Sequence, residues 1–259
     1  MTDPQCTETP RAPTIELRLG DYRTALADVA RVDAVITDPP YSERTHKGQQ
    51  TGLRDAEYQS SGKALAITGL GYSRWGPDDV ACFFNWAKRA DGWICAFTSH
   101  DLVATYELSA RAIGRYVFAP ISCVQPGRSV RLAGDGPANW ADHMVVCRPS
   151  AAPYSKWGSL PGAYVEARGV AAGIVAGAKP LDLMRAIIRD YSRPGDLICD
   201  PCAGGATTLI AAHMEGRSAI GAELDPKTYD LAKRRIDAYL ARGTLFTPRT
   251  TPTQETLIK

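Results

Sequence analysis

Between residues 181 and 240 the chain alternates between helical and extended patterns, and this alternation limits the possible folds more than any other feature. The predicted helices are residues 181–191, 206–215 and 226–240, and the predicted strands are 196–199 and 219–223. Neighbouring parallel strands need a long crossover connection, which is usually a helix. Strands that alternate with helices therefore indicate parallel pairing. We therefore predict an α/β fold with a mainly parallel sheet that helices cover on both faces.

The preceding part of the chain continues this alternation. Ser99 or Asp101 would suit the N-cap of the helix predicted at residues 101–113. A Gly-rich loop joins the strands predicted at 116–124 and 143–147, and we expect these two strands to pair antiparallel. Residues 42–77 and 149–178 do not fit the alternation, and loops this long in a compact domain are usually functional. The predicted strands are residues 15–19, 33–37, 93–98, 116–124 and 143–147, and the predicted helices are 78–89 and 101–113.

Composition limits the class of protein. The 259 residues suffice for one large domain, and 44% hydrophobic with 22% charged residues is typical of a soluble globular protein. No apolar run reaches the roughly 18 residues of a membrane span, and the polar start lacks the apolar stretch of a signal peptide, so we expect a cytoplasmic protein. We expect disordered tails at residues 1–13 and 243–259 and one domain over residues 14–242.

Charge and metal-ligand spacing add little. A net charge of +2 permits contact with nucleic acid without arguing for it. Cys199-x-x-Cys202 has the spacing of half a zinc site, but no second pair of ligands stands at a suitable distance, and the four histidines form no metal pattern. We predict no metal site.

The segment from Asp200 to Glu223 has the pattern of a nucleoside site. A strand ends in Asp200 and is followed by a turn with Gly204 and Gly205, a helix, and a second strand that ends in Glu223. Glycines let the backbone turn tightly and approach a ligand, and an acid about 20 residues later can accept hydrogen bonds from ribose hydroxyls. The G-x-G-x-x-G of a dinucleotide site is missing. Asp200 would repel a pyrophosphate but suits the cationic sulfonium and amino group of S-adenosylmethionine.

The motif Asp38-Pro39-Pro40-Tyr41 ends another apolar strand. Prolines fix φ and remove N–H donors, so this loop is rigid and presents acceptors, with the Tyr41 ring beside them. Two acceptors on the amino group of a nucleobase would free its delocalised lone pair for attack on a methyl group held in line. A base inside a duplex must be flipped out to reach such a loop.

These two motifs together resemble the amino-group DNA methyltransferases, which act on N6 of adenine or N4 of cytosine. Asp38–Tyr41 matches their catalytic form (D/N/S)-P-P-(Y/F/W), and Asp200–Thr208 resembles their D-P-F-x-G-S-G-T-T. The catalytic motif comes first, as in the circularly permuted β group. The resemblance covers about residues 15 to 240. It implies the Rossmann-like S-adenosylmethionine-dependent methyltransferase fold with seven strands, in which the catalytic strand and the strand ending at Asp200 are neighbours at the switch point.

The resemblance also implies site residues. Asp21 follows the first strand and is expected near the cofactor adenine, while Lys179-Pro180 resembles the K-P that opens the helix before the cofactor strand. Glu223 resembles the ribose-binding acid. The implied catalytic residues are Asp38, Pro39, Pro40 and Tyr41, and the implied cofactor-binding residues are Asp21, Lys179, Asp200, Pro201, Cys202, Ala203, Gly204, Thr207, Thr208 and Glu223.

The sequence departs from the family pattern in the glycine turn. Cys202 stands where the family usually has Phe, and Gly205 and Ala206 replace Ser and Gly. Ala206 should fit only if the backbone there needs no positive φ.

Two long segments are predicted to contact DNA. Residues 149–178 occupy the usual place of the target-recognition region but are short for it, so we expect a short target, relaxed specificity or reading by a dimer. Residues 42–77 follow the catalytic loop and are expected to be mobile and to close over the flipped base or bind phosphates, which position without specifying. The candidate contacts are Arg44, His46, Lys47, Arg54, Lys63 and Arg74, then Arg128 and Arg131, and then Tyr154, Lys156, Trp157, Tyr164 and Arg168.

The sequence thus predicts an enzyme of a bacterium or phage that transfers a methyl group from S-adenosylmethionine to N6 of adenine in DNA, leaving S-adenosylhomocysteine. Three alternatives stay open: N4 of cytosine, RNA as the substrate, and a non-catalytic nucleic-acid-binding subunit of a methyltransferase. An Asp in the first catalytic position favours adenine, and the intact catalytic motif argues against a non-catalytic subunit. A homodimer is possible. The target sequence and the biological role do not follow from the sequence.

Overall fold

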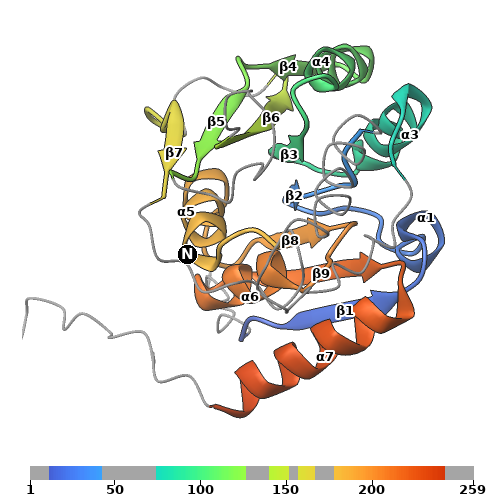
Figure 1. Cartoon of the computed structure of the whole chain (residues 1–259), viewed down its shortest axis with the longest axis vertical. Helices are drawn as coiled ribbons and strands as arrows, with labels where there is room; N and C mark the ends of the chain where they lie inside the picture. Colours follow the sequence, from blue (N-terminus) through green and yellow to red (C-terminus); the bar gives the residue numbers. More distant parts are fainter. Residues whose placement is uncertain (1–11, 43–73, 127–139, 152–156, 167–177, 243–259) are drawn as a thin grey trace, which may run out of the picture.

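The computed structural model describes residues 12–42, 74–126, 140–151, 157–166 and 178–242. Its centre is one mixed sheet of nine strands in the order β1-β9-β8-β2-β3-β6-β5-β7, with β4 paired to β6 (Figure 1). The strands are β1 (Ile15–Leu19), β2 (Ala34–Thr37), β3 (Ile94–Thr98), β4 (Arg115–Val117), β5 (Ile121–Val124), β6 (Ala141–Pro149), β7 (Ala163–Val165), β8 (Leu197–Asp200) and β9 (Ser218–Glu223).

Helices pack on both faces of this sheet. Side chains of β2 alternate between the faces: Ala34 and Ile36 join the apolar cluster under α5, α6 and α7, while Val35 joins the cluster under α3 and α4. Both faces are therefore buried, as predicted for a doubly wound fold. The helices are α1 (Tyr22–Ala25), α3 (Pro77–Ala87), α4 (Val103–Ala112), α5 (Leu181–Tyr191), α6 (Thr207–Met214) and α7 (Pro226–Ala241).

The parallel part of the sheet brings the two predicted motifs together. β2 pairs in parallel with β8, with Ala34 opposite Ile198 and Val35 opposite Cys199. From this pair the chain leaves in opposite directions, because β2 is followed outward by β3 and β8 by β9. The predicted switch point between the two motif-bearing strands is confirmed, and ligands bind at such points in α/β sheets.

The predicted number of seven strands was wrong. Residues 116–124, expected as one strand, form β4 and β5, because Pro120 between them lacks the N–H that a continuous ladder needs. β7 is the other addition and comes from the segment 149–178, where no strand was predicted. The expected antiparallel pairing with residues 143–147 is confirmed, since β4 and β5 both pair antiparallel with β6.

The predicted cap of the helix at residues 101–113 was also wrong. α4 begins later, at Val103, and its N-cap is Leu102, which makes no side-chain capping bond. The chain first makes a tight turn in which the Leu102 N–H donates to the Ser99 carbonyl at 3.0 Å. This turn places Leu102, and neither Ser99 nor Asp101, at the N-cap position of α4.

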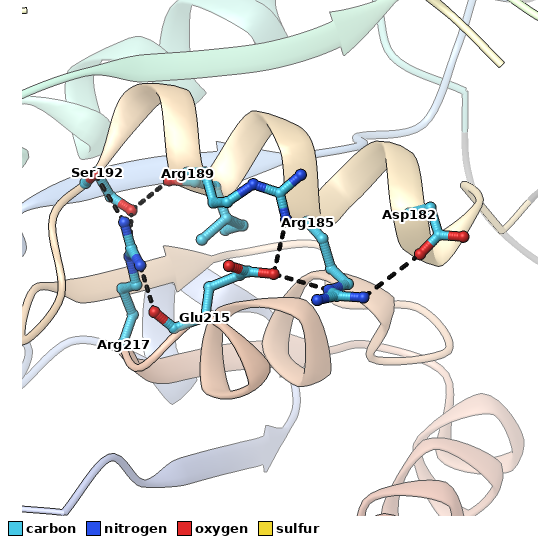
Figure 2. A network of polar contacts seen from close by, with 7 residues as sticks. Asp182, Arg185, Arg189, Ser192, Glu215 and Arg217 are labelled. Atoms are coloured by element: carbon cyan, nitrogen blue, oxygen red, sulfur yellow. Dashed lines mark hydrogen bonds and ion pairs between the residues drawn. The ribbon is translucent and has the colours of Figure 1, made fainter. Parts of the chain in front are cut away.

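A polar network fixes α5 against the end of α6, as Figure 2 shows. Arg185 and Arg189 of α5 both donate to the Glu215 carboxylate, at 2.7 and 2.8 Å. Arg217 donates to the Ser192 hydroxyl at 2.9 Å and also to the Glu215 carbonyl. Because the carboxylate is shared by two guanidinium groups and largely buried, it positions α5, and the segment that leads into it, more firmly than one exposed ion pair would.

Several predictions concern residues outside the described part of the chain. They include the tails, apart from residues 12 and 13, most of segments 42–77 and 149–178, and all candidate DNA contacts except Arg74, Trp157 and Tyr164. None of the described helices combines the length and apolarity that crossing a bilayer requires.

Gly221 provides a test of how closely β8 and β9 must approach. A Cβ at this position would lie 2.8 Å from the Asp200 carbonyl oxygen and 3.0 Å from the Ala203 Cβ. We predict that Gly221→Ala lowers the free energy of unfolding by about 1–3 kcal/mol, measured by urea denaturation, because overpacking moves backbone. Gly162→Ala is the matched control, since its Cβ meets open space. Equal stabilities of the two variants would contradict the prediction.

Candidate active site

The predicted catalytic loop, Asp38–Tyr41, follows β2 and is held by Lys179, which lies just before α5. The Lys179 Nζ donates to Asp38 Oδ2 at 2.7 Å and to the Tyr41 hydroxyl at 2.8 Å. Its side chain is only 5% exposed. The structure therefore places the Lys179 ammonium against the reaction loop, and its predicted contact with a cofactor stays a prediction.

One oxygen of the Asp38 carboxylate has no hydrogen-bond partner in the described part of the chain. Asp38 Oδ1 is buried and accepts no hydrogen bond from the residues that the structure describes. Loss of water raises the pKa of Asp38 above its ordinary value, although the nearby Lys179 charge acts in the opposite direction. A buried acceptor without a donor is unfavourable unless a ligand supplies the donor. This oxygen is therefore poised for an N–H group.

Asp200 links the two motifs through hydrogen bonds. The Thr37 hydroxyl donates to Asp200 Oδ1 at 2.7 Å, and the Cys202 N–H donates to the same oxygen at 3.1 Å. Thr37 immediately precedes Asp38, so this bond ties the catalytic loop to the glycine turn. Burial raises the pKa of Asp200 to about 6, against the hydrogen bonds that favour its anion.

Glu223 closes the turn at the tip of β9. Its Oε2 accepts the Gly204 N–H at 2.9 Å and its Oε1 accepts the Asp225 N–H at 2.8 Å. Each carboxylate oxygen can accept a second hydrogen bond, so hydroxyl groups of a ligand can still be bound. Gly204 has a φ of +49°, a conformation that favours glycine.

The structure brings the remaining predicted cofactor residues to the same edge of the sheet. The Gly20 N–H donates to the Glu223 carbonyl at 2.8 Å, which sets Asp21 beside the tip of β9, where it caps α1 and pairs with Arg23. The Ala203 N–H donates to the Ala222 carbonyl at 2.8 Å. Pro201 and Cys202 lie in the same turn, before Ala203 in the chain. Thr207 and Thr208 are the first two residues of α6.

Ala206 adopts the conformation that the sequence argument disfavoured. Its φ is +60° and its ψ is 26°, so the backbone does need a positive φ where the family pattern has Gly. A side chain in this left-handed region costs roughly 1–2 kcal/mol. Ala206 is fully buried, so its methyl group packs in the core and offsets part of that cost.

Arg235 is a residue of this region that sequence analysis missed. In the sequence it belongs to a basic run with Lys233 and Arg234, which is typical of a solvated helix face. Instead it reaches back from α7 and donates to the Gly205 carbonyl at 2.6 Å and to the Thr207 hydroxyl at 2.8 Å, on both sides of Ala206. Its spacing of three residues from Ala232, on the buried stripe of α7, was the signal that placed it near the core.

Asp142 on β6 is a second missed residue. Its side chain is 7% exposed, and its Oδ2 lies 3.4 Å from the Lys179 Nζ. The predicted strand began at residue 143, which left this position in a loop.

Two predicted DNA contacts pack against the core, Tyr164 buried and Trp157 partly buried. Tyr164 is 9% exposed and donates its hydroxyl to Asp190 at 2.6 Å, so the prediction that it contacts DNA was wrong. Trp157 packs edge-on against the buried Trp93, and Arg193 lies 3.8 Å above its ring. Both rings support the junction of β7 with α5.

Part of the chain is similar in sequence to known DNA methyltransferases. Residues 164–234 match the family model described as DNA methylase, N6_N4_Mtase. The type II methyltransferase M.MthZI of Methanothermobacter thermautotrophicus is 45% identical over 65 residues, which are 25% of this chain and 18% of that protein. The DNA adenine methyltransferase YhdJ of Escherichia coli K12 is 41% identical over 59 residues, which are 23% and 20%. The matches thus span about a fifth of these relatives' own length.

Solved structures share the fold over most of the chain. M1.HpyAVI in complex with SAM has a TM-score of 0.64 at 19% identity, covering 86% of this chain and all of that one. The cytosine-N4-specific PvuII DNA methyltransferase has a TM-score of 0.61 at 16% identity, covering 91% and 95%. Over residues 164–234 the sequence is similar to that of the amino-group DNA methyltransferases. The fold of this chain is the α/β methyltransferase fold of these proteins.

Ala206 gives a direct test of strain in the glycine turn. We predict that Ala206→Gly raises the free energy of unfolding by up to about 1 kcal/mol in urea denaturation, because glycine adopts positive φ without steric cost. Ala238→Gly, at an exposed position inside α7, should lower it by a similar amount. Destabilisation by both variants would show that Ala206 is not strained.

Proposed function

We propose that this protein transfers a methyl group from a bound S-adenosylmethionine to an exocyclic amino group of a base in DNA. The observation that carries the proposal is Asp38 Oδ1, which is buried in a rigid two-proline loop and has no hydrogen-bond partner among the described residues. An amino group donates two N–H bonds, and this oxygen with the Pro39 carbonyl offers two acceptors. Drawing on both N–H bonds localises the nitrogen lone pair, and the Tyr41 ring provides a face on which the base stacks.

The glycine turn fits the cofactor. S-adenosylmethionine supplies an electrophilic methyl group on a cationic sulfur. Glu223 would hold the ribose hydroxyls, and the turn at Gly204 leaves room for a close backbone approach. Asp200 is 1% exposed and acts through its charge more than through contact, since its Oδ1 already accepts two hydrogen bonds. The product would be S-adenosylhomocysteine.

Adenine N6 is the proposed target atom. Asp38 in the first catalytic position supports it, and YhdJ is an adenine enzyme. Cytosine N4 is the second candidate, which the fold of the cytosine-N4-specific PvuII enzyme favours. RNA as the substrate and a non-catalytic role stay open alternatives, and the complete Asp38–Tyr41 loop argues against the latter. A homodimer and a cytoplasmic location stay predictions.

The proposal is tested with labelled S-adenosylmethionine and unmethylated genomic DNA, followed by nucleoside analysis of the digest. We expect N6-methyladenine from the wild type and at least about 100-fold less from Asp38→Ala, since the positioned acceptor acts in the transition state. Asp237→Ala, on the exposed side of α7, is the control and should stay active. N4-methylcytosine would establish the second candidate, and an active Asp38→Ala would refute the role of this carboxylate.

Cofactor affinity should depend on pH through Asp200. With a pKa of about 6, this carboxyl is neutral at pH 5 and ionised at pH 7. Since the anion attracts the cationic sulfonium, we predict that S-adenosylmethionine binds about tenfold more weakly at pH 5 than at pH 7 by calorimetry. S-adenosylhomocysteine, whose sulfur is neutral, should show a smaller change. In Asp200→Asn the difference between the two ligands should vanish; its persistence would assign the effect to another group.

A further inference from the structure

Three charged side chains from three parts of the chain meet beside the proposed transfer site. The Lys179 ammonium contacts Asp38 Oδ2 at 2.7 Å and lies 3.4 Å from Asp142 Oδ2. The Phe97 ring closes one side of the ammonium, 4.8 Å from its centroid. The ammonium is thus shared between a carboxylate of the catalytic loop and a carboxylate of β6.

The net charge of this cluster suits a transfer in which positive charge develops on the amino nitrogen. Among the residues that the structure describes, the two carboxylates and the one ammonium of this cluster leave one net negative charge. During the transfer the amino nitrogen's lone pair forms the new N–C bond while the S–C bond breaks. The positive charge thereby moves from sulfur to nitrogen, and one N–H proton then leaves to water. A fixed negative charge in a partly dry site stabilises that developing cation.

We propose that Asp142 is a positioning residue for the methyl transfer: its carboxylate shares the Lys179 ammonium with Asp38 and keeps the reaction pocket negative. The inference rests on the proposed function. Without Asp142, Lys179 would neutralise Asp38 alone, and the catalytic carboxylate would be a weaker acceptor for the amino group. Asp142 does not need to touch the base, because it acts through Lys179 and through its charge.

The groups that face Asp38 allow a prediction of sign. Among the described residues they are Lys179, Asp142 and Tyr41, with Asp200, Cys202, Cys123 and Tyr106 farther off. The negative charge of Asp142 raises the pKa of Asp38, and the positive charge of Lys179 lowers it. Removing the Asp142 charge should therefore lower the pKa of Asp38 and move the acid limb of the rate to lower pH.

The test compares Asp142→Asn with the wild type from pH 5 to pH 9. We expect kcat on the pH plateau to fall about tenfold, the acid limb to move to lower pH, and the affinity for S-adenosylmethionine to stay within about threefold. Asp142→Glu keeps the charge and should recover most of kcat. Asp190→Asn is the matched control, because it alters a half-buried carboxylate that bonds Tyr164, outside the cluster.

A second measurement does not depend on activity. Carbon-13 titration of the aspartate carboxyls in the cofactor-free protein, with Asp38 assigned through Asp38→Asn, should show a lower pKa for Asp38 in Asp142→Asn. If Asp142→Asn fails to fold, Asp142→Ser replaces it as the uncharged variant in both measurements. A normal kcat, a loss of kcat without a moved acid limb, no recovery in Asp142→Glu, or an unchanged pKa of Asp38 would overturn the inference. A wild type without any transfer would instead count against the proposed function, and the titration would still decide the role of Asp142.

Discussion

The hydrogen bond from the Thr37 hydroxyl to Asp200 connects the two halves of the proposed site, and the arrangement of that site depends on it. The residues are 163 positions apart in the sequence, yet the parallel pairing of β2 with β8 sets their strand ends side by side. Because both strands are buried on both faces, a shift in their register would move apolar side chains out of two cores at once. The packing of the sheet therefore fixes the position of the loop Asp38–Tyr41 relative to the glycine turn.

Low exposure makes the charges of this site strongly interdependent. Asp38, Asp200 and Glu223 all have pKa values raised by burial, so each gains from a cation or from donors that keep it ionised. The Lys179 ammonium donates to Asp38, and backbone N–H groups donate to Glu223. Asp200 accepts from the Thr37 hydroxyl and the Cys202 N–H. Under the proposed function, a bound cationic cofactor would lower all three pKa values and so favour the ionised form of Asp38.

The sequence predicted most of this fold because local patterns determine most of its elements. α5 occupies the predicted residues without a shift, since its apolar side chains follow helical spacing from end to end. The placement of Lys179 was not predictable in the same way: its contacts with Asp38 and Tyr41 span about 140 residues and depend on the order of strands. Asp142 was not predicted as a site residue for a related reason, because one polar residue at a strand end gives no periodic signal. The division of residues 116–124 followed from Pro120, a signal that was present and not used.

The glycine turn shows how a departure from a family pattern can be accommodated. Ala206 adopts a left-handed conformation that its side chain disfavours, and such conformations persist only where the surroundings determine them. Here the Ala206 N–H bonds the Ala203 carbonyl, Arg235 holds the residues on both sides, and Gly221 lets the neighbouring strand approach. These contacts come from the turn, from α7 and from β9. The shape of the turn is therefore imposed by the surrounding fold, so that losing a glycine changes its stability more than its geometry.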